Sequence, residues 1–243
     1  MSGALVALAV VTAAVAATGG AAAPAIISSF APPSAPGGLP PGWEALTFKK
    51  IERHTRYSVV ADGDGHVLRA ESEAAASGLY RPLDLDPRVY RRLSWRWKVD
   101  NVLVKGDARK KAGDDYPARI YVAFRHDPET ATAWECLRFG AIRLLYGRYP
   151  PRHVINYIWD NRLPVGTSLD NAYTDRAKMI VVESGTALVG RWVDEERDLL
   201  ADYRRLFAAE PPPIEGIAVM TDTDDTGERA VAYYGTIALR TAP

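Results

Sequence analysis

The sequence predicts a mainly β protein, an antiparallel β-sandwich of jelly-roll or lectin-like type with one or two accessory helices. Ten short strand-like runs follow one another, and most are separated by Gly, Pro, Asp or Asn, the usual turn residues. Because no regular series of helices lies between these runs, successive strands are expected to pair antiparallel and to form two facing sheets.

The best-defined strand is 91–99, where apolar and polar residues alternate strictly. In an extended chain this places Trp95 and Trp97 on one face and Arg96 on the other. We expect the two indoles in the core and Arg96 on a face that meets solvent or a partner. The ten expected strands are 45–51, 56–60, 67–73, 79–83, 91–99, 119–125, 154–159, 178–183, 217–221 and 231–240.

The amino-terminal segment resembles a secretory signal peptide, assigned to 1–23. Residues 4–17 are apolar apart from Thr12, although no Lys or Arg precedes them. The run is shorter than the ~20 residues of a membrane span, so no stable insertion is expected after cleavage. A misassigned start codon and a short membrane anchor are the alternatives. The only cysteine, Cys136, has no partner for an internal disulfide. A periplasmic or secreted protein is predicted.

Residues 24–42 are rich in Pro, Ala and Gly and are expected to form an extended, flexible linker. The remainder, 43–243, is expected to form a single β-sandwich domain. Two segments have helical spacing, 129–146 and 194–207. The second also has an acidic first turn and a basic last turn, which match the helix dipole.

The overall charge is balanced, with 30 basic and 30 acidic residues. This gives no global field that would attract nucleic acid, so no nucleic-acid partner is expected. The basic loop 105–111 lacks interleaved aromatic residues and is interpreted as a solvated loop. Nothing in the sequence predicts the oligomeric state.

A candidate ligand site lies where the acidic loop at Asp114 and Asp115 enters an alternating strand. Arg119 and Tyr121 share one face of that strand. If the strand lies near Arg96, these side chains would form a polar patch that suits a hydroxyl-rich or carboxylated ligand, because Arg offers a planar fork and Tyr a stacking surface. The alternative is that these Asp and Arg side chains pair with each other.

A second candidate is Asn156, whose amide could bridge the hydroxyls of a glycan. Its neighbours Tyr157 and Trp159 lie on the opposite face of the expected strand, where a core role is favoured.

Oxygen ligands for a cation occur at Asp222, Asp224 and Asp225, on a loop with Gly227. An EF-hand is excluded, because Tyr233 stands where the bidentate Glu would be. A structural calcium site and an Asp-rich hairpin turn both remain open, and no other cofactor is expected.

For catalysis, the best carboxyl pair is Glu71 and Glu73, two residues apart on one strand face. Arg69 on the same face favours a solvated row of charges instead. No catalytic residue is therefore assigned, and no metal-spaced His pair, nucleophile elbow or phosphate-binding loop occurs.

Several short phrases, in order along 43–240, resemble a bacterial family known only as domain of unknown function 3047. The resemblance implies an exported protein, but it brings no activity and no catalytic residues. The phrases are Thr55-Arg-Tyr-Ser58, Leu68-Arg-Ala-Glu-Ser72, Ser94-Trp-Arg-Trp97, Gly113-Asp-Asp-Tyr116, Arg119-Ile-Tyr-Val122, Asn156-Tyr-Ile-Trp159, Gly190-Arg-Trp192, Glu196-Arg-Asp198 and Thr221-Asp-Thr-Asp-Asp-Thr226.

Together these observations favour a non-enzymatic, ligand-binding β-sandwich with carbohydrate as the expected ligand. Two alternatives remain open. One is a polysaccharide-cleaving enzyme, a glycoside hydrolase or lyase, in which Glu71, Glu73, Asp114 or Asp115 would supply acid and base. The other is a cell-envelope module whose charged sheet face contacts another protein.

Overall fold

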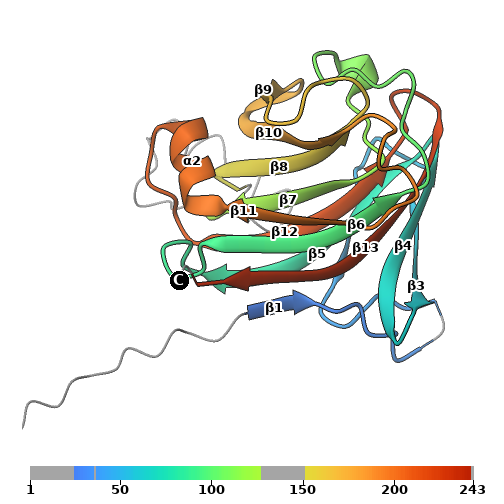
Figure 1. The fold of residues 1–243 in the computed structure, drawn as a ribbon, viewed down its shortest axis with the longest axis horizontal. Helices are drawn as coiled ribbons and strands as arrows, with labels where there is room; N and C mark the ends of the chain where they lie inside the picture. Colours follow the sequence, from blue (N-terminus) through green and yellow to red (C-terminus); the bar gives the residue numbers. More distant parts are fainter. Residues whose placement is uncertain (1–24, 36, 127–150, 242–243) are drawn as a thin grey trace, which may run out of the picture.

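The computed structural model describes residues 25–35, 37–126 and 151–241, which form two facing β-sheets (Figure 1). Sheet A has the strand order β11-β6-β13-β4-β3, with β1 paired to β13. Sheet B has the order β2-β5-β12-β7-β8-β10-β9. The predicted β-sandwich of jelly-roll type is confirmed. The pairing is antiparallel apart from β8 and β10, which run parallel.

All ten expected strands are present, with boundaries that differ by a few residues. Three further strands, β1, β9 and β11, were not expected. The elements are β1 Ala25–Ser28, β2 Glu44–Leu46, β3 Arg56–Asp62, β4 Gly65–Glu73, β5 Ala76–Leu85, β6 Arg92–Val99, the short 3-10 helix η1 Lys111–Gly113, β7 Arg119–Phe124, β8 His153–Asp160, β9 Ser168–Asn171, β10 Thr174–Ser184, β11 Val193–Asp198, α2 Leu199–Phe207, β12 Ile214–Asp222 and β13 Arg229–Arg240.

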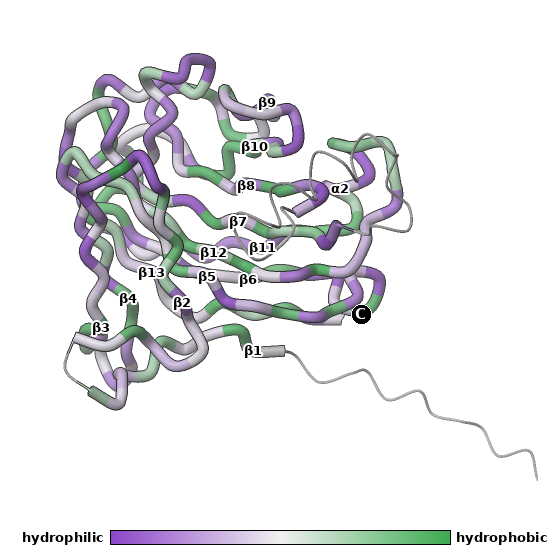
Figure 2. Tube along the Cα trace, turned by 180° about the vertical axis from the view of Figure 1, so that it is seen from behind, coloured by the Kyte–Doolittle hydropathy of each residue, from purple (hydrophilic) through white to green (hydrophobic). Residues whose placement is uncertain are grey.

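Aromatic side chains from the two sheets meet in the core. Trp95 and Trp97 project inward from β6 and contact each other edge to face, 5.5 Å between ring centroids. Trp95 lies 5.3 Å from Tyr157 of β8, and Trp97 lies 6.0 Å from Trp159. Figure 2 shows the alternation of hydrophobic and hydrophilic residues along the strands that produces this arrangement. The core role expected for all four residues is confirmed.

The helix expected at 194–207 begins later, because its first residues form β11. Residues Val193–Asp198 pair antiparallel with β6 and extend sheet A. Asp198 then caps α2: its carboxylate accepts a hydrogen bond of 3.0 Å from the backbone N–H of Ala201. The charge pattern predicted the helix correctly but not the strand that precedes it. The other expected helix, 129–146, lies outside the described residues, as does the leader at 1–23.

Part of the segment expected to be a flexible linker packs against the sandwich. β1 pairs with β13, and Phe30 is buried, stacked on Trp43 with 5.3 Å between ring centroids. Ser28 Oγ accepts hydrogen bonds from Trp43 Nε1 (3.1 Å) and from the backbone N–H of Phe30 (3.0 Å). The proline content suggested a spacer, but the apolar residues between the prolines anchor this segment to the domain.

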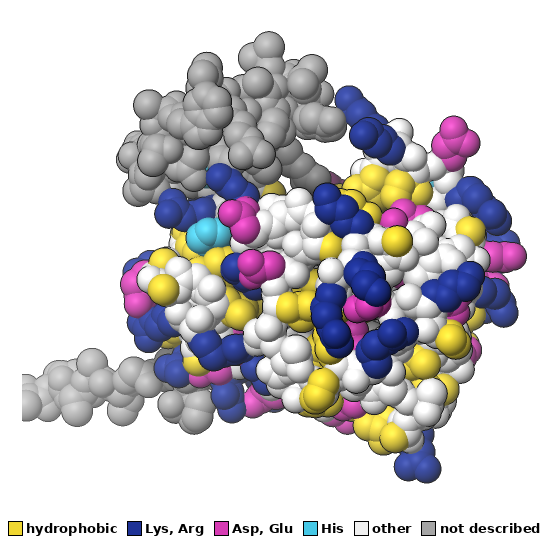
Figure 3. Space-filling view, turned by 90° about the horizontal axis from the view of Figure 1, so that it is seen from above, with side chains coloured by type: hydrophobic (Ala, Val, Ile, Leu, Met, Phe, Trp, Pro, Cys, Tyr) yellow, Lys and Arg dark blue, Asp and Glu magenta, His cyan; other side chains and the backbone are white. Residues whose placement is uncertain are grey.

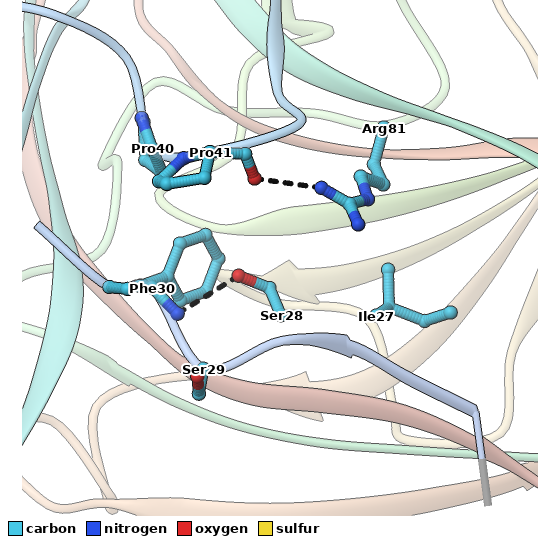
Figure 4. Close-up of a pocket in the computed structure, with 8 residues that line it drawn as sticks. Ile27, Ser28, Ser29, Phe30, Pro40, Pro41 and Arg81 are labelled. Carbon is cyan, nitrogen blue, oxygen red and sulfur yellow. Dashed lines mark hydrogen bonds between the residues drawn. The ribbon is translucent and has the colours of Figure 1, made fainter. Parts of the chain in front are cut away.

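A small cavity of about 190 Å³ lies beneath this segment (Figure 4). It lies between Ile27, Phe30 and Pro40, and Arg81 closes it by donating a hydrogen bond of 2.7 Å to the carbonyl of Pro41. Ligand pockets usually have roughly 300–1,000 Å³. We therefore interpret this cavity as a gap in the packing between the segment and the sandwich, and not as a ligand pocket.

If the segment belongs to the fold, Phe30→Ala will lower the free energy of unfolding by about 3 kcal/mol, the usual result of deleting a buried phenyl ring. Urea denaturation of the full chain measures this value. Leu39→Ala serves as the control, because Leu39 is exposed in the same segment. Equal stability of the two variants would show that the segment is only a spacer.

Candidate functional site

Most of the predicted site residues lie together on the outer side of sheet B. Arg119 and Tyr121 project outward from β7, since Ile120 between them lies in the core. Asn156 of β8 stands directly opposite Tyr121 in the strand register. The acidic residues Asp114, Asp115, Asp222 and Asp224 lie at the end of these strands beside Arg119.

Arg96 does not join this group, which corrects the expected patch. It lies on β6 in sheet A, whereas Arg119 lies on β7 in sheet B. The Arg96 guanidinium stacks on the ring of Trp192, 4.3 Å from its centroid, and donates a hydrogen bond to the carboxylate of Asp62. The alternation placed Arg96 outward correctly, but it could not show that its strand belongs to the other sheet.

Arg119 is the centre of a buried polar group that we call the Arg119 cluster: Asp114, Asp115, Tyr116, Arg119, Asp222 and Asp224. Only 4% of Arg119 is exposed. Its Nη2 donates to Asp222 Oδ2, and its guanidinium lies 5.0 Å from the Tyr116 ring centroid and 5.2 Å from that of Tyr121. Burial alone would lower the pKa of Arg119, but the carboxylate of Asp222 raises it above its ordinary value.

The acidic loop before β7 is held in place by its own side chains. Asp114 accepts hydrogen bonds from the Tyr116 hydroxyl (3.0 Å) and from Asn171 Nδ2 (2.9 Å). Asp115 Oδ2 accepts one from the backbone N–H of Thr226 (2.6 Å). Gly113 is required here, because a Cβ at this position would lie 2.6 Å from the backbone nitrogen of Asp107. These bonds bring the two acidic loops of the sequence together.

The second acidic loop, 223–228, connects β12 in sheet B to β13 in sheet A, so it is a crossover between the sheets and not a hairpin turn. Carboxylate oxygens of Asp115, Asp222 and Asp224 lie within 4.8 Å of one another. Asp225 is not in this group; its carboxylate accepts a hydrogen bond of 2.9 Å from the hydroxyl of Tyr173. The predicted set of ligands was Asp222, Asp224 and Asp225. The group that converges contains Asp222 and Asp224 as predicted, but Asp115 in place of Asp225.

Negative charge exceeds positive charge in this group. Burial, followed by the carboxylates of Asp115 and Asp225, raises the pKa of Asp224 to about 6. Burial also raises the pKa of Asp222, although Arg119 opposes that shift. Asp115 Oδ1 is buried and has no hydrogen-bond partner among the described residues. The chemistry of the group therefore suits a bound cation.

Asn156 is the most unusual residue of the site. It is 1% exposed, yet within the described part of the chain neither its Oδ1 nor its Nδ2 has a hydrogen-bond partner. Arg119 Nε and Nη1 also lack a hydrogen bond there, although Nη1 lies 4.0 Å from the carboxylate of Asp114. Leaving a buried amide unpaired costs about 1–3 kcal/mol. Within the described residues, these groups on neighbouring strands therefore provide donors and an acceptor that no hydrogen bond uses.

The carboxyl pair proposed for catalysis has a different environment. Glu71 forms ion pairs with Arg69 (2.9 Å) and Arg229 (2.5 Å), and these hydrogen bonds lower its pKa to about 2. Glu73, at the end of the same strand, is exposed. A carboxyl with so low a pKa is not a general acid near neutral pH, because it holds no proton there. The row of surface charges is the better interpretation.

One carboxyl pair escaped the sequence analysis. Glu195 lies on β11, the edge strand of sheet A, and Glu183 lies on β10 of sheet B. Burial and the neighbouring Glu183 carboxylate raise the pKa of Glu195 to about 8, and burial raises the pKa of Glu183. Because Glu183 and Glu195 lie on different strands, no local pattern in the sequence predicts that they are neighbours.

This pair predicts a pH dependence of stability. The folded state raises the pKa of Glu195 above its ordinary 4.5, so it holds the proton more tightly than the unfolded chain. The contribution of Glu195 to stability is therefore fully present below about pH 4.5 and is lost as the pH rises towards 8. Glu195→Gln should be more stable than the parent at pH 8.5, on the order of 2 kcal/mol, and similar to it at pH 4.5.

Thermal unfolding between pH 4.5 and 8.5 measures this dependence. Glu196→Gln is the matched control, because the neighbouring Glu196 is exposed and pairs with Arg92 at the surface. The interpretation fails if Glu195→Gln and Glu196→Gln follow the same pH profile.

Among the described residues, no helix is long and apolar enough to cross a membrane. No curated protein matches the chain in sequence.

Solved structures that resemble the fold include two of the family 11 carbohydrate-binding module from Clostridium thermocellum. The first belongs to the cellulosomal cellulase Lic26A-Cel5E and shows 12% identity and a TM-score of 0.46, covering 90% of this chain and 95% of that one. The second, in complex with a β-1,3-1,4-mixed-linked tetrasaccharide, shows 11% identity and a TM-score of 0.43, covering 90% and 96%.

A third structure is the glycoside hydrolase domain of Endo-D from Streptococcus pneumoniae R6, with 12% identity, a TM-score of 0.35, and coverage of 82% of this chain and 21% of that one. The sequence itself matches a family model over residues 41–238. As its short phrases predicted, the chain belongs to the family described as Protein of unknown function (DUF3047).

Proposed function

We propose that this protein is an exported β-sandwich that binds carbohydrate, without cleaving it, on the outer side of sheet B. The observation that carries the proposal is the buried, unpaired amide of Asn156 beside Tyr121 and Arg119. Export rests on the leader-like residues 1–23.

The unpaired groups match the chemistry of a sugar. An amide offers a donor and an acceptor side by side, as two neighbouring hydroxyls of a pyranose require. Arg119 adds two donors, at Nε and Nη1, which favour a hydroxyl or carboxylate oxygen. The half-buried ring of Tyr121, directly opposite Asn156, supplies an apolar surface for the C–H face of the sugar. A purely apolar ligand would leave all of these groups unpaired.

The test uses Asn156→Leu, which keeps the size of the side chain and removes its hydrogen bonds. Without ligand, we expect the free energy of unfolding of this variant to exceed that of the parent by about 1 kcal/mol, because an unpaired buried amide is gone. The variant should therefore unfold at a higher temperature. We also expect it to lose at least about tenfold in affinity for any glycan that the parent binds.

The measurement is a thermal-shift screen of the full chain against soluble glycans, followed by titration of the hits. Tyr121→Ala should weaken the same hits, whereas Arg96→Ala, on the other sheet, should not. A screen without hits would oppose the proposal. Release of reducing ends or unsaturated products from a bound glycan would replace it with the hydrolase or lyase alternative.

We also propose that Asp115, Asp222 and Asp224 hold a structural calcium ion beside the sugar site. Calcium binds oxygen ligands at about 2.3–2.6 Å, so oxygens that share one ion lie up to about 5 Å apart. The 4.8 Å limit for these three carboxylates fits that requirement. A divalent cation would also offset the excess negative charge of the cluster.

Millimolar calcium should raise the melting temperature of the full chain by several degrees, because the ion binds only the folded state. Asp224→Asn should abolish the increase, since it removes one anionic ligand. Asp225→Asn is the matched control, because Asp225 points to Tyr173 and should leave the response intact. The assignment would be contradicted if calcium did not raise the melting temperature of the parent, or if the increase were lost only in Asp225→Asn.

A further inference from the structure

One end of the sandwich carries the most exposed apolar side chains of the described residues. Val104 is 76% exposed, Val165 is 61% exposed and Tyr173 is 55% exposed. They lie on three loops, 100–110, 161–167 and 171–174, which we call the loop end. Apolar side chains that are exposed together at one end of a domain are typical of a surface that contacts a partner.

The same loops carry an excess of basic side chains. Four exposed cations lie on them, at Lys105, Arg109, Lys110 and Arg162, and a fifth, Lys111, follows directly at the start of η1. Within the described residues, the only carboxylate in an ion pair with any of them is Asp107, which pairs with Lys110 (3.3 Å) and lies 4.0 Å from Arg109. Figure 3, seen from above, shows Lys and Arg side chains beside hydrophobic ones, with Asp and Glu side chains among them.

The loop end is fixed from below. Asn161 Nδ2 donates to the carbonyls of Leu103 (2.5 Å) and Gly106 (3.0 Å), and Arg162 Nη2 donates to that of Val104 (2.9 Å). Ala108 and Leu163 pack in the small apolar cluster beneath these loops. The loops are thus held by their buried residues, and the apolar tips face outward on a stable base.

Four carboxylates lie on or beside these loops, at Asp100, Asp107, Asp225 and Glu228. Glu228 is bonded to the loop backbone. It accepts hydrogen bonds from the backbone N–H groups of Val104 (3.1 Å) and Lys105 (2.7 Å). Lys105 Nζ donates to the carbonyl of Thr226, and Lys111 lies over the Tyr173 ring, 5.3 Å from its centroid. The five cations therefore outnumber these four carboxylates by one.

We propose that the loop end is a peripheral docking surface for an anionic phospholipid membrane. Positive side chains attract the lipid phosphates, and the apolar tips enter the boundary between headgroups and acyl chains. The exposed valines favour a membrane over a nucleic acid as the partner. An aliphatic side chain cannot stack on a base, and it buries no apolar surface against a polyanion that stays in water. This surface is separate from the proposed sugar site, and the proposal does not depend on that function.

The test is sedimentation of the full chain with vesicles of phosphatidylcholine, alone or with about one third phosphatidylglycerol. We expect at least about tenfold stronger partition onto the anionic vesicles, which falls as salt is added. Val104→Asp combined with Val165→Asp should reduce this partition by a further tenfold or more, since it removes the apolar tips and adds negative charge.

Val89→Asp is the matched control, because Val89 is an exposed valine on the loop that precedes the other end of β6. The apolar residues 4–17 are uncharged and common to every variant, so binding through them would not distinguish the two vesicles. Equal partition onto both vesicles, or equal binding by the double variant and the control, would overturn the proposal. Duplex DNA bound as tightly as anionic vesicles, regardless of the valines, would assign the surface to a polyanion instead.

Discussion

The contact between Trp97 of sheet A and Trp159 of sheet B fixes the orientation of both sheets. Their ring centroids lie 6.0 Å apart in the core, and Trp95 and Tyr157 pack beside them. Because successive residues of a strand face opposite ways, these inward rings place Asn156 on the outside of sheet B. The candidate site is thus a consequence of core packing: a shift of one residue along β8 would move the aromatic rings to the outer side of sheet B and Asn156 into the core.

Alternation along a strand predicts which residues face outward, and that part of the sequence analysis was correct. It does not predict which strands are neighbours. Arg96 and Arg119 both face outward as expected, but β6 pairs with β11 and β13, whereas β7 pairs with β12 and β8. Strand order depends on contacts between distant segments, which a local pattern cannot contain. The same reason explains why β11, an edge strand rich in charged residues, was taken for the start of a helix.

The acidic cluster was likewise predicted only in part. Both acidic loops were recognised as candidate sites from their composition, one for a ligand and one for calcium. The two loops are joined by the hydrogen bond from the backbone N–H of Thr226 to Asp115, two residues that lie 111 positions apart. The sequence therefore did not reveal that the loops form one cluster. The choice between Asp115 and Asp225 depends on a single hydrogen bond, from the hydroxyl of Tyr173, that removes Asp225 from the group. Such a contact has no signal in composition or spacing.

The remaining question is why a stable fold retains unpaired polar groups. The aromatic core supplies a large favourable burial, so an unpaired amide at Asn156 is tolerated without loss of the fold. Tolerance alone does not explain its presence, since Leu at this position would pack against the neighbouring Met179 at no such cost. Groups that lower the stability of the free protein while offering hydrogen bonds are characteristic of binding sites, where the ligand completes them. By this argument the instability at Asn156 is itself the strongest physical reason to look for a polar ligand on sheet B.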